Sequence, residues 1–122
     1  MAAKGNVLII DDVPERALAL EELVSSEGFT TTTITEIIGA EVSLVTDSDF
    51  DVVLWKEARK VLREMDAQVP AIMLSDTVNA EQMMTALRLG ASDFFVRPID
   101  DKHALVKSIE RCVRQRNMRR EL

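Results

Sequence analysis

The chain has 122 residues, of which 47% are hydrophobic and 30% charged, and its 15 basic and 21 acidic side chains give a formal net charge of -6. This composition excludes disordered and collagen-like chains, and the length predicts one domain. No apolar run approaches the roughly 20 residues that a membrane span needs. The N-terminus does not resemble a secretory signal. We therefore expect a cytoplasmic location and no membrane partner.

Short apolar runs alternate along the chain with longer stretches of helical period, which is typical of an α/β fold with a parallel sheet. The predicted strands cover residues 6–10, 29–34, 51–55, 71–74 and 94–96. The three most apolar runs are expected at the centre of the sheet, because a parallel strand covered on both faces needs no polar alternation. The polar, β-branched run at residues 30–33 is expected nearer an edge.

Two of the predicted helices have recognisable ends. Pro14 suits the first turn of a helix that ends at Gly28, and Asn79 is predicted to cap a second helix that ends at Gly90. In this second helix Met83 and Met84 are interpreted as core filler. One face of the last helix is expected to be buried, and it carries Leu105, Val106, Ile109, Cys112 and Val113.

Cys112 and His103 are the single cysteine and the single histidine of the chain. The chain therefore cannot form an internal disulfide, a zinc site or a Cys-His catalytic pair by itself. We interpret Cys112 as a packing residue.

The C-terminal part of the chain differs in charge from the rest. Residues 97–122 carry eight basic and four acidic side chains, a net charge of +4, which leaves -10 for the first 96 residues. Acidic residues interrupt this basic tail and no aromatic residue accompanies it, so nucleic-acid binding by this domain is not expected. Positive charge is favourable at a helix C-terminus. We predict a basic helical extension at residues 111–122 that either leads to an output domain or forms a homodimer.

Polar residues follow three of the predicted strands. Asp11 and Asp12 end the first, Ser75 ends the fourth, and Arg97 and Pro98 end the fifth. Chemistry in an open parallel sheet gathers at the carboxyl ends of the strands. Two adjacent carboxylates call for a cation such as Mg²⁺ or a basic side chain, although a solvated turn before a helix has the same sequence.

In these motifs the sequence resembles the receiver (CheY-like) domain of two-component response regulators. The match covers nearly the whole chain and includes VLIIDD at 7–12, DVVL at 51–54, VPAIMLS at 69–75 and GASDFFVRP at 90–98. The resemblance implies a flavodoxin-like (βα)₅ fold with strand order 2-1-3-4-5. It also implies Mg²⁺ at Asp11 and Asp12, a phosphoryl-binding hydroxyl at Ser75, an aromatic switch at Phe94 and a cis Arg97-Pro98 peptide. A core aromatic is an equal interpretation of Phe94.

The sequence departs from the family at the phosphoacceptor. Lys56 stands where the family has the aspartate that takes a phosphoryl group from a histidine kinase, and Arg97 replaces a lysine. An ammonium group is neither that nucleophile nor a ligand for Mg²⁺, which counts against both a kinase partner and the metal. Residues 57–62 are expected to continue directly as helix. We interpret Lys56 as a counterion of Asp11 and Asp12, the alternative being a surface lysine, and Trp55 as a core residue.

The sequence therefore favours a degenerate receiver, a single domain over residues 1–122 that is not an enzyme, requires no cofactor and binds a protein partner or an output domain. One alternative is a receiver that is phosphorylated on a substitute carboxylate, Glu57 or Asp51. Another is a flavodoxin-like protein that binds a small ligand or nucleotide, which the lack of a glycine-rich turn after the first strand disfavours.

Overall fold

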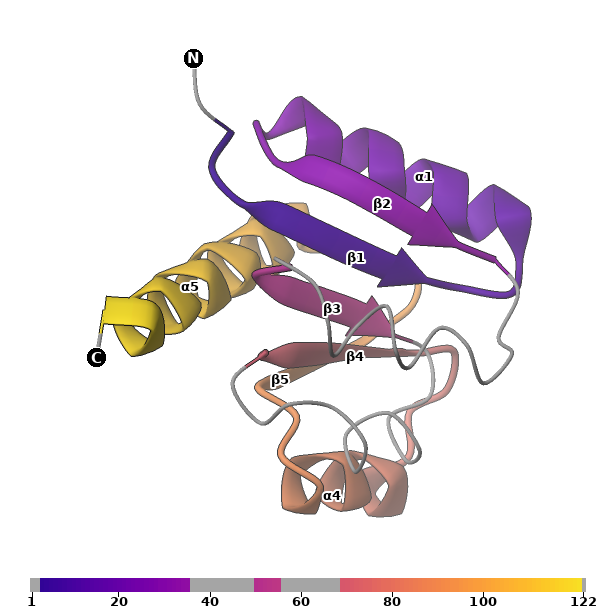
Figure 1. Cartoon of the computed structure of the whole chain (residues 1–122). Helices are drawn as coiled ribbons and strands as arrows, with labels where there is room; N and C mark the ends of the chain where they lie inside the picture. The colour runs from indigo at the N-terminus through magenta and orange to yellow at the C-terminus, as the bar shows by residue number, and fades with distance from the viewer. Residues whose placement is uncertain (1–2, 36–49, 56–68, 122) are drawn as a thin grey trace.

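The computed structural model describes residues 3–35, 50–55 and 69–121. Five parallel strands form one sheet in the order β2-β1-β3-β4-β5 (Figure 1). Their bounds lie within one residue of those predicted, and they are β1 (Asn6–Ile10), β2 (Thr30–Ile34), β3 (Val52–Trp55), β4 (Ala71–Ser75) and β5 (Asp93–Val96). The predicted α/β class and the strand order are confirmed.

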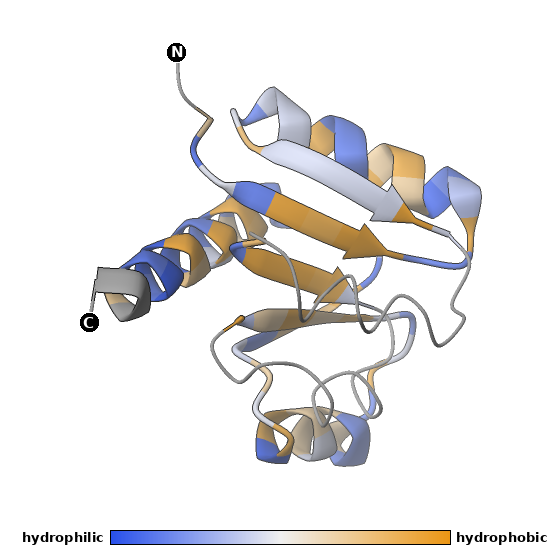
Figure 2. Ribbon diagram, in the orientation of Figure 1, coloured by the Kyte–Doolittle hydropathy of each residue, from blue (hydrophilic) through white to orange (hydrophobic). Residues whose placement is uncertain are grey.

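Hydrophobicity decides which strands are central. Every residue of β3 and β4 is buried, as are the last four residues of β1, whereas the threonines of β2 are partly or fully exposed. Figure 2 shows this difference as apolar colouring on β1 and β3 beside a nearly neutral β2. The predictions of an apolar centre and of an edge position for the threonine-rich strand are both confirmed.

The described helices cover the two faces of the sheet. They are α1 (Pro14–Ser26), α4 (Ala80–Arg88) and α5 (Lys102–Glu121). Side chains alternate between faces along a strand, so Val7 and Ile9 of β1 share one core cluster with buried residues of α1 and α5, whereas Leu8 and Ile10 join a second cluster on the opposite face. On that opposite face α4 packs against β4 and β5.

The predicted helix ends are confirmed. Pro14 occupies the first turn of α1, and the side chain of Asn79 caps α4 by accepting a hydrogen bond of 3.1 Å from the amide of Gln82. Gly28 and Gly90 each have a φ of 98°, a left-handed conformation that glycine adopts without a steric penalty. These two glycines end α1 and α4.

The prediction that Met83 and Met84 fill the core is wrong. Their side chains are 39% and 52% exposed, and Ala86 is the buried residue of α4. The helix approaches the sheet through this small side chain. It packs in one cluster with Met73 of β4, with Phe94 of β5 and with Ala91, which precedes β5. Close approach through alanine leaves the long methionine side chains at the surface.

The buried face of α5 is as predicted. Leu105, Val106, Ile109, Cys112 and Val113 all lie in the main core. Burial raises the pKa of the Cys112 thiol to about 11, so this thiol carries no thiolate character at neutral pH. Beyond Val113 the helix continues past the sheet (Figure 1), and Met118 is exposed. Trp55 is buried as expected, and the predicted helix at residues 57–62 lies outside the described residues.

Candidate functional site

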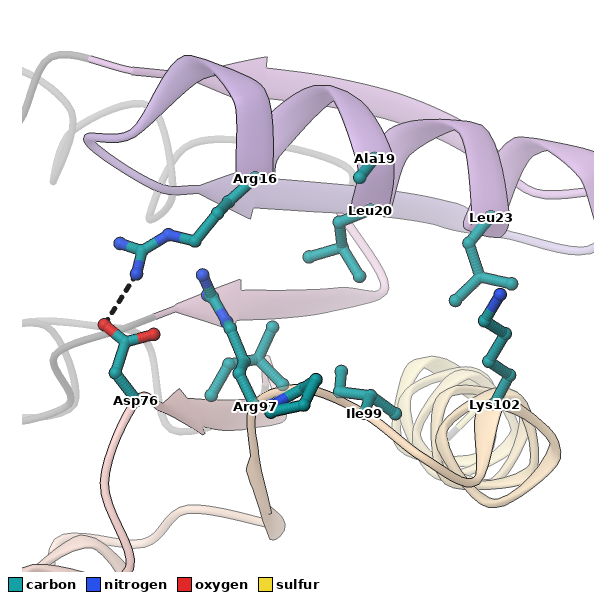
Figure 3. A pocket seen from close by; sticks show the side chains of 10 residues that line it. Arg16, Ala19, Leu20, Leu23, Asp76, Arg97, Ile99 and Lys102 are labelled. Carbon is teal, nitrogen blue, oxygen red and sulfur yellow. Dashed lines mark hydrogen bonds and ion pairs between the residues drawn. The ribbon is translucent and has the colours of Figure 1, made fainter.

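The carboxyl ends of β1, β4 and β5 meet at one edge of the sheet because the strands are parallel. Asp11 follows β1, Asp76 follows β4, and Arg97 follows β5. Arg16 reaches the same place from the first turns of α1 (Figure 3). Two carboxylates and two guanidinium groups from four elements therefore gather at this edge.

Asp11 is the centre of the group. Its side chain is fully buried, and its two oxygens accept hydrogen bonds from three donors. Oδ1 accepts from the amide of Val13 at 2.9 Å and from Nη2 of Arg16 at 3.1 Å. Oδ2 accepts from Nη1 of Arg97 at 2.5 Å. A buried carboxylate needs such compensation, since an unpaired charge in the interior costs several kcal/mol.

Arg16 links Asp11 to the neighbouring carboxylates. Its Nη1 donates to Oδ2 of Asp76 at 2.6 Å, and its Nη2 lies 3.7 Å from Oδ1 of Asp12. The guanidinium group thus contacts three aspartates and connects α1 to the turn after β4. We call Asp11, Asp12, Asp76, Arg16 and Arg97 the carboxylate–guanidinium cluster.

The cluster shifts two pKa values in the directions expected for ion pairs. Burial alone would raise the pKa of Asp11, but the Val13 amide, Arg97 and Arg16 together hold it below 3.8. Burial would lower the pKa of Arg16, but its contacts with Asp76 and Asp11 raise it above its usual value. Asp11 and Arg16 are therefore both charged at neutral pH.

Of the other residues singled out from the sequence, Ser75 precedes Asp76 of the cluster, whereas Phe94 packs elsewhere on the sheet. The hydroxyl of Ser75 is buried within its own turn, 2.9 Å from the carbonyl oxygen of Thr77 and 3.1 Å from Oε1 of Gln82. The ring of Phe94 packs against the α4 side of the sheet. The Arg97-Pro98 peptide is cis, as the resemblance implies.

Two of the predicted residues, Lys56 and Glu57, lie outside the described residues, and the counterion role of Lys56 stays a prediction. Asp51 is not brought to the cluster. It precedes β3 at the opposite edge of the sheet, where its buried carboxylate accepts a hydrogen bond of 2.7 Å from the amide of Asn6. The length of β3 separates Asp51 from the cluster, roughly 13 Å at about 3.3 Å per residue.

Sequence reasoning missed Arg16. The signal was the four-residue spacing between Asp12 and Arg16, which places opposite charges on neighbouring turns. That spacing indicates an ordinary surface pair on a helix. The contacts with Asp11 and Asp76 exist because the fold carries the first turns of α1 over the ends of β1 and β4.

The donor set does not fit the Mg²⁺ that the resemblance implies. Mg²⁺ requires oxygen ligands with free lone pairs in octahedral geometry, but both oxygens of Asp11 already accept hydrogen bonds and one guanidinium group contacts Asp11, Asp12 and Asp76. Within residues 3–35, 50–55 and 69–121, no three His, Cys, Asp or Glu side chains are grouped so that they could hold a metal. Arg16 supplies positive charge where a metal would have to bind.

Comparisons with known proteins agree with the fold. The chain is 24% identical over 127 residues to the nitrogen assimilation regulatory protein NtrX of Azorhizobium caulinodans, and 26% identical over 128 residues to the transcriptional regulatory protein YkoG of Bacillus subtilis. The matches cover 96% and 97% of this chain but 28% and 55% of those proteins. This chain therefore spans only part of the length of its relatives. No protein-family model matches it.

Solved structures with the same fold include full-length FixJ from B. japonicum, with a TM-score of 0.83 and 24% identity over 94% of this chain and 60% of that one. A response regulator receiver domain from Clostridium thermocellum has a TM-score of 0.80 and 18% identity over 93% of this chain and 98% of that one. The chain has the fold of response-regulator receiver domains. In the described part of the chain no helix is long and apolar enough to cross a membrane.

Asp11→Asn should destabilise the protein by about 3 kcal/mol at neutral pH, because it removes the buried charge that pairs with two guanidinium groups. Since the pKa of Asp11 is lowered in the folded state, its contribution is present above pH 3.8 and is lost as the pH falls through the lower, folded-state value. When the pH is lowered below about 4, the free energy of unfolding of the variant should therefore fall less than that of the native chain. Urea unfolding across this pH range measures both effects.

Asp100→Asn is the matched control, because Asp100 is exposed and outside the cluster. It should change stability by less than about 0.5 kcal/mol. Equal effects of the two substitutions would contradict the central role of Asp11.

Mg²⁺ should leave the thermal unfolding midpoint of the native chain unchanged, because Arg16 and Arg97 already form ion pairs with the aspartates of the cluster. Arg16→Met removes this charge, while Arg97 still pairs with Asp11. At millimolar Mg²⁺ the variant should gain about 4 °C, as expected for weak binding to the folded state. Arg88→Met, an exposed change on α4, is the control and should gain nothing. A midpoint of the native chain that rises with Mg²⁺ as much as that of Arg16→Met would show that Arg16 does not exclude the metal.

Proposed function

We propose that this chain, which has the fold of response-regulator receiver domains, is a signalling domain of two-component systems that acts through protein–protein contact and is not phosphorylated in the usual way. The observation that carries the proposal is the occupied carboxylate of Asp11, whose oxygens accept from Arg16, Arg97 and the amide of Val13. Both oxygens of Asp11 therefore already accept hydrogen bonds and are poorly suited to bind a metal ion. On this proposal the chain is a binding module and not an enzyme.

The sequence at the phosphoacceptor position supports the same proposal. Lys56 stands there by alignment, and an ammonium group cannot form the acyl phosphate that a carboxylate forms. Of the substitute carboxylates, Asp51 is engaged at the opposite edge of the sheet with the amide of Asn6. We therefore favour interaction without phosphorylation over phosphorylation at a substitute residue.

The relatives support a partner in the form of an output domain. Both NtrX and YkoG are described as regulatory proteins, and each is longer than the part that this chain matches. We infer that residues 1–122 act as one receiver-like unit within a longer protein, or alongside one. The basic end of α5 would then lead to the output domain or pair with a second copy.

A surface that suits such contacts lies on and before α4. Val78 is 89% exposed, and Met83, Met84 and Leu87 are also exposed. Contiguous patches of exposed apolar side chains often mark sites of protein–protein interaction, whereas single exposed apolar side chains are common on protein surfaces. Methionine side chains adapt to different partners because they are flexible and polarisable.

Acetyl phosphate with Mg²⁺ should leave the intact mass of the native chain unchanged, because neither the acceptor nor the metal site is in place. Mass spectrometry after incubation measures this directly. Lys56→Asp supplies a carboxylate at the acceptor position and shows whether the acceptor alone is missing, and Glu57→Gln is its neighbouring control. A stoichiometric phosphoryl adduct on the native chain would overturn the proposal, and peptide mapping would then assign it to Glu57, Asp51 or another residue.

Deletion of residues 117–122 should leave the fold intact, because the buried residues of α5 end at Arg116 in the described part of the chain. The thermal midpoint should shift by less than about 3 °C. If this end of α5 forms a homodimer, sedimentation velocity will show a loss of self-association on deletion. Identical sedimentation of the two chains across the same concentrations would remove the homodimer and leave the link to an output domain.

A further inference from the structure

A cavity of about 580 Å³ lies between α1 and the segment that connects β5 to α5 (Figure 3). Ala19, Leu20 and Leu23 of α1 form one wall, and Pro98 and Ile99 form the other. Pockets that bind small molecules have volumes of about 300–1,000 Å³ and mostly apolar linings with a few polar groups. This cavity has both properties, and neither the phosphoryl chemistry of receivers nor the protein contacts proposed above make use of it.

Charged groups lie at both ends of the cavity. Figure 3 shows Arg16, Asp76 and the guanidinium group of Arg97 at one end, and Lys102 beside Leu23 at the other. The lining thus carries three cations and a single carboxylate. The Arg16–Asp76 ion pair of 2.6 Å closes the first end by joining α1 to the turn after β4.

The cations differ in how far neighbouring side chains already satisfy them. Arg16 contacts three aspartates. Within the described residues Arg97 donates one side-chain hydrogen bond, to Asp11, although a guanidinium group has five N–H donors. In the described part of the chain Lys102 forms no ion pair, and its residue is exposed. Lys102 and the remaining donors of Arg97 can therefore receive an anionic group at the cavity.

We propose that this cavity binds a small amphipathic anion, with one carboxylate or sulfonate beside Lys102 and an apolar body between α1 and Ile99. The apolar walls suit a hydrocarbon or aromatic body, and the excess of cations disfavours a cationic ligand. A nucleotide would place several phosphate charges against walls that offer few polar donors. A medium-chain fatty acid and an aromatic carboxylic acid share the required chemistry.

Such a ligand would contact the two segments that hold Asp11. Arg16 belongs to α1, and Arg97 belongs to the segment between β5 and α5. The two arginines line the cavity and also donate hydrogen bonds to the buried carboxylate of Asp11. Occupation of the cavity would thus fix the spacing of α1 relative to the β5–α5 segment. The site depends on the cavity alone and stands whether or not the chain is phosphorylated.

Anilinonaphthalene sulfonate, a fluorescent probe with an aromatic body and one sulfonate, tests the proposal on the full chain. We expect saturable one-to-one binding by the native protein, and binding at least about ten-fold weaker for N-phenylnaphthylamine, which lacks the sulfonate. Displacement of the probe by octanoate would indicate a ligand with an aliphatic body, and displacement by naphthoate a ligand with an aromatic body. Failure of both acids to displace it would overturn the proposal.

Two variants locate the site. Lys102→Gln should weaken binding of the probe about five-fold, whereas Lys107→Gln, the same change at an exposed lysine of the same helix that lies 4.0 Å from Glu110, should not. Ala19→Phe places a ring in the cavity and should abolish binding. Circular dichroism and the thermal midpoint show that each variant is folded, which excludes probe binding to a loosened core.

The proposal would be overturned by absence of saturable binding, by equal affinity for the neutral analogue, or by equal effects of the two lysine substitutions. It would also be overturned if folded Ala19→Phe bound the probe as tightly as the native chain. Phosphoryl adduct formation is measured separately, so failure here leaves the proposed signalling role untouched, and the reverse also holds.

Discussion

A carboxylate without access to solvent has to be neutralised by its neighbours, and Asp11 is the residue on which that requirement falls. Its two oxygens take hydrogen bonds from the amide of Val13 and from two guanidinium groups. These donors come from the β1–α1 turn, from α1 and from the end of β5. The buried charge therefore fixes the position of α1 relative to the carboxyl edge of the sheet, and Arg16 extends the connection to Asp76 after β4.

This interaction balances the acidic residues at the carboxyl edge of the sheet with side chains of the chain itself. An acidic cluster at a sheet edge is unfavourable unless cations balance it. Here the balancing charges are the guanidinium groups of Arg16 and Arg97. Because they belong to the same chain, the fold keeps them next to the carboxylates. An external cation would have to displace a guanidinium group and leave it unpaired, which opposes metal binding. The cluster is thus suited to holding one arrangement of the fold.

The same arginines connect the cluster to the cavity between α1 and the β5–α5 segment. Arg16 points toward Asp76 (Figure 3), and Arg97 donates to Asp11. The cavity beside them is lined by Leu20, Leu23 and Leu74. The apolar surface of α4 lies on the opposite face of the sheet. A ligand at the cavity and a protein at α4 would therefore contact separate parts of the molecule.

The sequence by itself determined the strands, the capped helices and the polar residues at the strand ends, because hydrophobic period and helix-end residues are local properties of the chain. The strand order followed from the resemblance to receiver domains. It placed Asp11 and Arg97 at one edge correctly. Only the tertiary structure showed that Arg16 and Asp76 complete the cluster and that Met83 and Met84 stay exposed. Those outcomes depend on how closely each helix approaches the sheet and on which side chains from distant segments then meet, and a pattern of spacings does not contain these distances.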